Sequence, residues 1–475
     1  MSETFNFAEF PAASRRDWER RVLESLKGRT LEALKSTTED GIDIGPLHEP
    51  ALGEATEMRS GGEAPSVIQR MDHPEPLAAN ALAQDDVLTG ANGLALVFAG
   101  APSARGFGLK SADARSIGLA LKDLPLHGLT LRLEAGARGA EAAEALAEVI
   151  AARSLNPERM AVSFGMNPLG ALASEGRSKQ GWGEEARRVG DVAKALAREF
   201  TGPFVEADGR VYHDGGMSPA QELGATIATA VEYLRLLEGR LDDTKAAQAI
   251  GITLASDADM FVSLAKFRAA RLLWRQTASS CGLPEAPLKL HAESSFRMMT
   301  RQEPQGNLLR NVAAVFAAGL GGADSICALP FSLALGLPDQ FARRMARNVQ
   351  SILIHESNLH RVEDVAAGSG YVDHLTTALA EKAWSFLQEI EGLSGIRAAL
   401  DRGFIRETAI RAREARASDI KAGKRTIIGV TAYRQTESTA ASILPVDREI
   451  FAALAGGLAL HPMRDSEPFE ADAAT

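Results

Sequence analysis

Regular alternation between short apolar segments and helix patterns is the feature that most constrains the fold of this chain. Segments of strand length occur at residues 93–99, 129–134, 160–164, 204–205, 252–254, 288–291 and 325–329. Helix patterns lie between and after them, at residues 113–124, 140–153, 184–200, 218–240, 260–280, 307–320 and 339–356. About eight strand–helix units over roughly 300 residues predict an α/β fold, a parallel (β/α)8 TIM barrel. We expect the remaining strand near residues 361–365.

Two helix boundaries carry their own sequence signals. Ser218 offers an N-cap hydroxyl, Pro219 suits the first helical turn, and Gln221 completes a capping box. A stripe of apolar residues between 375 and 390 is followed by Gly392, which is typical of a helix end. We interpret such stripes as core packing.

The sequence divides into three parts. Residues 1–65 form an N-terminal arm and linker, residues 66–415 the barrel, and residues 416–475 a C-terminal extension. Apolar residues between Trp18 and Leu34 recur at helical spacing, so the arm packs either on its own domain or on a partner subunit. The extension is too short for a doubly wound cobalamin-binding domain, and we expect none here.

Composition narrows the classes of partner. The net charge of -10 argues against nucleic acid or an anionic membrane as the main partner. The two cysteines, Cys281 and Cys327, have no zinc-type spacing. No secretory signal is evident, and the longest apolar runs fall short of the roughly 20 residues that cross a bilayer. We therefore expect a cytoplasmic protein without a bound metal.

Polar residues just beyond the predicted strands are candidates for chemistry, because parallel barrels place their active sites at the carboxyl ends of the strands. The candidates are His291 with Glu293, Asp257 with Asp259, and Tyr212-His213-Asp214. In each group a carboxylate can orient a general acid or base. The alternative is that these residues only cap helices or satisfy loop backbone.

Four segments carry a resemblance to a known family. They are HAESSFRMMTRQEP at 291–304, GLGGAD at 319–324, LGLPDQFARRMARNVQ at 335–350 and GSGYVDHL at 368–375. They resemble the coenzyme-B12-dependent acyl-CoA mutases, the methylmalonyl-CoA mutase family, and the resemblance covers roughly residues 66–434. Within it, SSFRMMTR at 294–301 resembles the small, non-catalytic subunit of the heterodimeric bacterial enzyme.

The first departure from the catalytic pattern concerns a Tyr-His dyad. By resemblance, catalytic mutases end a strand in Gly-Tyr-His, where Tyr and His contact the substrate and the neighbourhood of the cobalamin. Alignment on Gly209 without a gap puts Arg210 and Val211 at the dyad. Valine can neither donate nor accept a proton. Tyr212 and His213 restore the pair only through a two-residue shift.

The second departure lies at a later strand end. Catalytic subunits carry His-x-Gln-Thr-Ser-Gly-Trp there, which leaves room for acyl-CoA. This chain has HAESSFR at 291–297, which brings in the charge of Glu293, the ring of Phe296 and the guanidinium of Arg297. These side chains predict an occluded barrel mouth. No segment resembles the cobalamin lower-ligand pattern Asp-x-His-x-x-Gly.

The resemblance implies a catalytically silent small (beta) subunit of methylmalonyl-CoA mutase, an isomerase of propionate metabolism. A large catalytic subunit, paired with this chain in a heterodimer and stabilised by it, would bind the adenosylcobalamin and the acyl-CoA. This interpretation assigns no catalytic, cofactor-binding or metal-binding residue to the chain.

Two other interpretations stay open. One is the catalytic component of a two-piece B12-dependent mutase whose cobalamin comes from a separate protein, with Tyr212, His213, His291 and Glu293 in its site. The other is an unrelated barrel lyase or hydrolase that uses His291 and Glu293.

Overall fold

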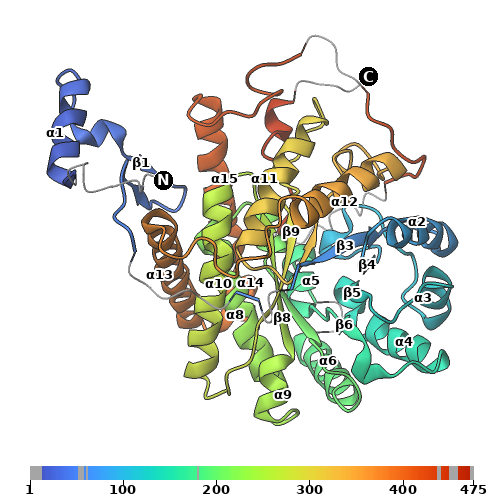
Figure 1. Ribbon diagram of the computed structural model, residues 1–475. Coiled ribbons are helices and arrows are strands. Elements are labelled where there is room, and N and C mark those ends of the chain that lie inside the picture. The colour runs from blue at the N-terminus through green and yellow to red at the C-terminus, as the bar shows by residue number, and fades with distance from the viewer. Residues whose placement is uncertain are drawn as a thin grey trace, which may run out of the picture.

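The computed structural model describes residues 13–51, 58–59, 63–178, 181–435, 440–448 and 458–470. At its centre is an eight-stranded parallel sheet in the order β6-β5-β4-β3-β10-β9-β8-β7. The outer strands β6 and β7 are joined by hydrogen bonds from Phe164 N to the Pro203 carbonyl (3.0 Å) and from Met166 N to the Phe204 carbonyl (3.2 Å). The sheet is thus closed into a (β/α)8 barrel with its strands in chain order (Figure 1).

The bounds of the elements follow the predicted alternation. The barrel strands are β3 (Ser66–Met71), β4 (Gly93–Val97), β5 (Thr130–Glu134), β6 (Ala161–Ser163), β7 (Val205–Asp208), β8 (Ile250–Ser256), β9 (Lys289–Ser294) and β10 (Ser325–Cys327). The surrounding helices include α2 (Pro76–Leu88), α3 (Ala114–Ala120), α4 (Gly139–Ala152), α6 (Trp182–Leu196), α8 (Pro219–Leu237), α10 (Met260–Ser280), α11 (Gly306–Leu320) and α12 (Gln340–His355). Every strand and helix predicted between residues 93 and 356 is confirmed.

The prediction of a strand near residues 361–365 is wrong. Those residues form bends and turns. The missing strand is β3, which lies at the start of the barrel and pairs with β4 and β10. It was overlooked because Gln69 and Arg70 interrupt its apolar pattern, although both are buried, at 1% and 2% exposure. A strand that faces a charged barrel interior does not have the sequence of an apolar strand.

The predicted capping box at the start of α8 is confirmed. The Ser218 side chain accepts a hydrogen bond from Gln221 N (3.4 Å), and the Gln221 side chain accepts one from Ser218 N (3.1 Å). Asp40 also accepts from Ala220 N (3.1 Å) and from the Ser218 hydroxyl. Asp40 belongs to the N-terminal hairpin of β1 (Ser36–Thr37) and β2 (Asp43–Ile44), which is thereby docked on the first turn of α8.

Helix α1 (Arg15–Ser25) stands away from the barrel, at the upper left of Figure 1. Ser14 caps it, yet none of its residues is buried and Leu23 is 44% exposed. Within the described residues α1 thus has an exposed face, and packing of this face on a partner subunit stays a prediction. Trp18 and Val22 are half-buried, and Leu26 at the C-terminal cap is 6% exposed.

Two further helices complete the scaffold. Helix α13 (Gly370–Gly392) ends at the glycine that the sequence predicted, and it packs on α8 and α10. Helix α15 (Phe404–Lys421) follows and carries Arg416, whose guanidinium contacts Glu39 (2.5 Å) and Asp465 (3.3 Å). None of the helices in the described ranges combines the length and apolar character that crossing a bilayer requires.

Residues 458–470, here called the C-terminal strap, lie across the mouth of the barrel. Backbone N–H groups of the strap donate to carbonyl oxygens of the barrel loops, from Leu460 to Ala173 (2.8 Å), from Met463 to Asp214 (3.0 Å) and from Asp465 to Arg297 (2.9 Å). The strap therefore covers the end of the barrel at which strands β7 and β9 finish.

Candidate functional site

Buried ion pairs fill the mouth of the barrel axis. We call this cluster the axial plug, and its members are Arg70, Asp72, Arg105, Glu134, Asp208, Arg210, Asp214 and Glu293. Glu293 is its hub, because its Oε2 accepts from Arg70 Nη1 (3.0 Å) and Arg210 Nη1 (2.9 Å) while its Oε1 lies 3.3 Å from Arg105 Nη2. The side chains of these four residues are between 2% and 5% exposed.

Arg210 ties the hub to a second layer of carboxylates. Its guanidinium donates to Asp208 (2.8 Å) and to Glu134 (3.1 Å), and Ser103 donates to Glu134 (2.5 Å). Burial works to raise the pKa of Glu134, but the neighbouring charges of Arg210 and Arg70 hold that pKa well below its usual range. Glu134 is therefore ionised, and the plug is a network of ion pairs between charged side chains.

The plug leaves almost no free space on the axis. A cavity of about 20 Å³ remains among Arg132, Glu134, Glu206, Asp208 and Arg210. That volume holds about one water molecule. Glu293 occludes the mouth as the sequence predicted, and Phe296 packs its ring against Arg105 at 4.7 Å. Arg297 instead points to Asp257 (3.5 Å) and Asp465 (3.7 Å), away from the plug.

The sequence-predicted pair of His291 and Glu293 does not form. Both side chains are buried, at 1% exposure, but no hydrogen bond or ion pair joins them among the residues that the structure describes. His291 Nδ1 lies 2.8 Å from Ser325 Oγ, and burial holds the pKa of His291 well below its usual value. The prediction of a carboxylate-oriented histidine at this pair is wrong, because Glu293 is occupied by three arginines.

The side chains of Tyr212, His213 and Asp214 diverge. The Tyr212 hydroxyl lies 2.7 Å from Thr229 Oγ1, and burial raises the pKa of Tyr212. Asp214 joins the plug through Arg105 (2.5 Å), and burial raises its pKa to about 6. These residues lie on the short helix α7 (Arg210–Gly215), where consecutive side chains point in different directions.

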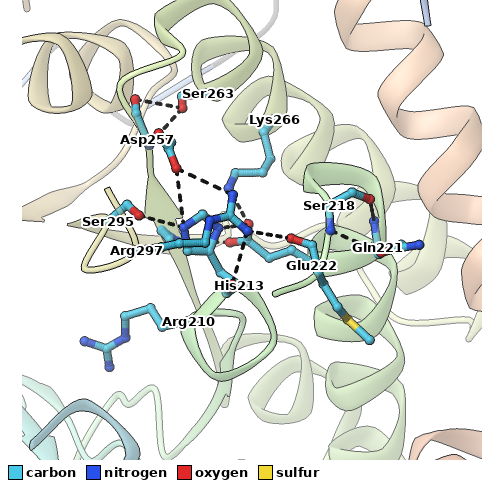
Figure 2. A network of polar contacts seen from close by, with 12 residues as sticks. Arg210, His213, Ser218, Gln221, Glu222, Asp257, Ser263, Lys266, Ser295 and Arg297 are labelled. Atoms are coloured by element: carbon cyan, nitrogen blue, oxygen red, sulfur yellow. Dashed lines mark hydrogen bonds and ion pairs between the residues drawn. The ribbon is translucent and has the colours of Figure 1, made fainter. Parts of the chain in front are cut away.

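His213 lies in a separate polar cluster (Figure 2). Its Nε2 is 2.7 Å from Ser295 Oγ, and its Nδ1 is 3.1 Å from Glu222 Oε2. Lys266 Nζ also donates to Glu222 Oε2 (2.5 Å). Burial, together with Arg297 and Lys266, holds the pKa of His213 well below its usual value, so the imidazole is neutral at pH 7. In Figure 2 Arg210 points away from this cluster.

The predicted pair Asp257 and Asp259 is also divided. Asp257 Oδ2 lies 3.6 Å from His213 Nε2 and belongs to the His213 cluster. Asp259 accepts a hydrogen bond from Val262 N (3.3 Å) and caps α10. The capping role that the sequence left open is confirmed for Asp259.

A side cavity of about 800 Å³ lies next to the His213 cluster. It is lined by the hairpin residues Ser36–Asp40 and Ile44, the first turns of α10 and α11, residues 424–428 and the strap residues Asp465 and Ser466. His213, Arg297 and Met298 form part of its wall. The cavity therefore opens beside the barrel axis, over the loops that follow β7, β8 and β9.

Comparison with known proteins identifies the family. A sequence model of methylmalonyl-CoA mutase matches residues 69–466. This chain belongs to the methylmalonyl-CoA mutase family. The methylmalonyl-CoA mutase small subunit of Streptomyces virginiae is 35% identical over 95% of this chain and 74% of its own length. The small subunit of Propionibacterium freudenreichii subsp. shermanii is 30% identical over 97% of this chain and 74% of its own length.

A relative named methylmalonyl-CoA mutase, without a subunit designation, matches a smaller part of this chain. That protein, from Rhizobium meliloti (strain 1021), is 34% identical over 55% of this chain and 37% of its own length. The likeness to small subunits thus extends over nearly the whole chain. The resemblance to the small subunit of the mutase family, predicted from residues 294–301, is confirmed.

The residues described here do not form the cobalamin site that the mutase family implies. Both ring nitrogens of His213 are engaged by Ser295 and Glu222, and its side chain is 1% exposed. His291 lies inside the barrel. The strap covers the mouth, so neither imidazole is presented as a ligand to a corrin above it.

Sequence reasoning missed several members of the two clusters, among them Arg70, Arg105, Glu134, Glu222 and Ser295. One signal was present in the sequence. Arg132 and Glu134, Glu206 and Asp208, and His291 and Glu293 are polar pairs two residues apart, on or just beyond predicted strands. This period places the members of each pair on one strand face. In this barrel that face is the interior.

Proposed function

We propose that this chain is the small subunit of a methylmalonyl-CoA mutase and that it takes no direct part in the isomerisation. The observation that carries the proposal is the axial plug. Arg210 stands where the aligned catalytic pattern has tyrosine, and it binds Asp208, Glu134 and Glu293 in the space that a substrate arm would need. Val211, which aligns with the catalytic histidine, is 6% exposed and lies in the core.

The reaction of the complex is assigned to a large catalytic subunit. That subunit binds methylmalonyl-CoA and converts it to succinyl-CoA, a step of propionate metabolism. Adenosylcobalamin, held by the same partner, supplies the radical chemistry. We place the heterodimer in the cytoplasm, in agreement with two cysteines that form no disulfide.

The contribution of this chain is burial and stabilisation of its partner. Obligate interfaces are large and apolar. Helix α1 offers such a surface, because it buries none of its residues and exposes Leu23 at 44%, with Trp18 and Val22 half-buried. We assign this helix to the contact with the large subunit.

Reconstitution tests the proposal. The chain is purified alone and together with a large subunit, and isomerisation of methylmalonyl-CoA is assayed with added adenosylcobalamin. We expect co-elution of the two chains and turnover only when the large subunit is present. Turnover by this chain with only a stand-alone B12 protein contradicts the proposal and supports the two-piece mutase.

Substrate binding gives a second measure. Calorimetric titration of the isolated chain with methylmalonyl-CoA is expected to give no saturable heat, because the axis is filled. In the complex, Tyr212→Phe and His213→Gln are expected to leave kcat unchanged, with the surface change Glu144→Gln as a matched control. Loss of kcat in the first two variants, at unchanged co-elution, assigns the chemistry to this chain instead.

A further inference from the structure

Outside the plug, three side chains have the geometry of a nucleophile, a base and an orienting carboxylate. Ser295 Oγ is 2.7 Å from His213 Nε2, and His213 Nδ1 is 3.1 Å from Glu222 Oε2. Glu222 Oε1 accepts the N–H of Ala255 (3.0 Å), so the carboxylate is fixed at both oxygens. Figure 2 shows the imidazole of His213 lying between the other two side chains. This is the order of contacts in a Ser-His-carboxylate triad.

The contacts of Glu222 set the tautomer of the imidazole. Glu222 Oε2 accepts from Lys266 Nζ (2.5 Å), so it acts as an acceptor and His213 Nδ1 carries the hydrogen. Nε2 then presents its lone pair to the Ser295 hydroxyl, which donates. Asp257 Oδ2, at 3.6 Å from Nε2, adds a second negative charge beside the ring. Burial, Arg297 and Lys266 nevertheless hold the pKa of His213 well below its usual value, so Nε2 is unprotonated and can accept the Ser295 proton.

The backbone after Ser295 supplies hydrogen-bond donors. Met298 N donates to Ser295 Oγ (3.3 Å) within the tight turn that follows β9. Across the described ranges, no acceptor is recorded for the N–H groups of Phe296 and Arg297. In serine hydrolases the N–H of the residue after the nucleophile belongs to the oxyanion hole. The N–H groups of Phe296 and Arg297 are therefore the candidates for this role.

The cluster faces a cavity that can hold a ligand. His213, Arg297 and Met298 line the side cavity of about 800 Å³, a volume typical of small-molecule sites. Val262, Leu309 and Ile427 give that cavity apolar surface. Ser295 itself is 1% exposed, and its hydroxyl contacts His213 and Met298, which both line the cavity.

We propose that Ser295 is the nucleophile of an acyl-transfer site that cleaves small acyl esters or thioesters. Its Oγ forms a bond to the acyl carbon while His213 Nε2 takes the hydroxyl proton. The bond from the acyl carbon to the leaving oxygen or sulfur breaks, and that atom receives the proton from Nε2. Water then attacks the acyl carbon and gives one proton to Nε2. The bond from the acyl carbon to Ser295 Oγ breaks, Nε2 passes that proton to Oγ, and the carboxylic acid is released.

A small organophosphate tests this directly. The full-length chain is treated with di-isopropyl fluorophosphate at pH 7.5, and the modified residue is located by peptide mass spectrometry. We expect one modified serine, Ser295, and no modification of Ser295→Ala. Ser294→Ala is the matched control, because Ser294 Oγ accepts from Leu329 N and touches no histidine. It is expected to be labelled at Ser295 like the unaltered chain.

The roles of His213 and Glu222 are tested by rates. His213→Gln is expected to slow labelling and p-nitrophenyl acetate hydrolysis by roughly 10²- to 10⁴-fold, the usual contribution of a general base. Glu222 is a positioning residue, so Glu222→Gln should also move the pH–rate profile to lower pH, because loss of the negative charge lowers the pKa of His213. Glu222→Asp should restore part of the rate. Thermal midpoints confirm that each variant is folded.

Two outcomes overturn the proposal. One is a folded, unaltered chain in which Ser295 stays unmodified under conditions that fully label a known serine hydrolase. The other is labelling of Ser295 that persists unchanged in His213→Gln. Because these assays need neither the large subunit nor cobalamin, their failure leaves the proposed small-subunit function intact.

Discussion

The axial plug and the side cavity lie at the same end of the barrel, and both are lined with charged side chains. In the plug, Glu293 and its three arginines are between 2% and 5% exposed, and about 20 Å³ of space remains beside them. In the side cavity of about 800 Å³, Asp257 and Asp465 are 25% and 22% exposed, while their partner Arg297 is 5% exposed. In this barrel the axis is thus filled by side chains, while a cavity remains open beside the axis.

The two regions differ in what their charged side chains do: in the plug they fill the interior, and in the side cavity they leave room for a ligand. In the plug each guanidinium contacts several carboxylates, so both signs are desolvated together. Desolvated pairs contribute little net stability, but removal of one partner is costly because it leaves an uncompensated buried charge. In the side cavity the carboxylates keep contact with solvent, which screens them. Removal of one charged side chain should therefore lower the free energy of unfolding more in the plug than in the side cavity.

The largest effect is expected at the hub of the plug. Glu293→Gln leaves Arg70, Arg105 and Arg210 without their shared carboxylate. We expect the free energy of unfolding to fall by about 3–5 kcal/mol, the usual cost of breaking a buried pair. Urea unfolding followed by circular dichroism measures it. A loss below about 1 kcal/mol would mean that solvent enters the plug and screens its charges, as it does in the side cavity.

The next effect depends on pH. Burial raises the pKa of Asp214 to about 6, above the roughly 3.9 of an unfolded aspartate. The folded state therefore binds this proton more tightly, and stability falls as pH rises from about 4 to about 6, by about 2 kcal/mol. Asp214→Asn should remove that part of the slope. The check is urea unfolding at several pH values, and identical slopes in both proteins would contradict it.

A smaller loss is expected in the wall of the side cavity. Burial works to raise the pKa of Asp257, but the charges of Arg297 and Lys266 lower it, so the carboxylate is ionised. Asp257→Asn removes one partner of Arg297, which keeps Asp465 at 3.7 Å. We expect a loss of about 1 kcal/mol by urea unfolding, because the site is partly solvated. A loss as large as that of Glu293→Gln would place this carboxylate with the plug.

The smallest effect sets the baseline. Glu144 and Arg188 form a surface pair at 2.7 Å with side chains 51% and 52% exposed. Glu144→Gln is expected to change the free energy of unfolding by less than about 0.5 kcal/mol, in line with other exposed pairs. A larger change in the same urea experiment would show that exposure does not rank these charges.

Much of the barrel could be predicted from sequence because its outer faces follow simple periods. Helix α13, for example, shows its buried stripe and its terminal glycine directly in the sequence. Strand β3 could not be predicted, because Gln69 and Arg70 interrupt its apolar pattern. Arg70 faces an interior whose charges come from other strands, and Gln69 faces helix α12. The family could be predicted from the local sequence at residues 291–375, because a sequence resemblance can be recognised without knowledge of the barrel interior.

The candidate sites were less predictable because their partners are far apart along the chain. Arg70 meets Glu293 across 223 residues and Arg105 meets Glu293 across 188. Sequence proximity suggested that His213 works with Tyr212, whereas the structure gives it Ser295 and Glu222 on other elements. Pairing across the barrel depends on register and strand order, and neither is encoded in a local pattern.

The contacts of Arg416 bear on the order in which parts of the molecule can pack during synthesis. It contacts Glu39 of the N-terminal hairpin and Asp465 of the strap. The hairpin leaves the ribosome early, but its guanidinium partner comes after the barrel and the second carboxylate later still. The contacts of Arg416 with both carboxylates can therefore form only after residue 465 has been synthesised, and recruitment of a partner through the arm need not wait for them.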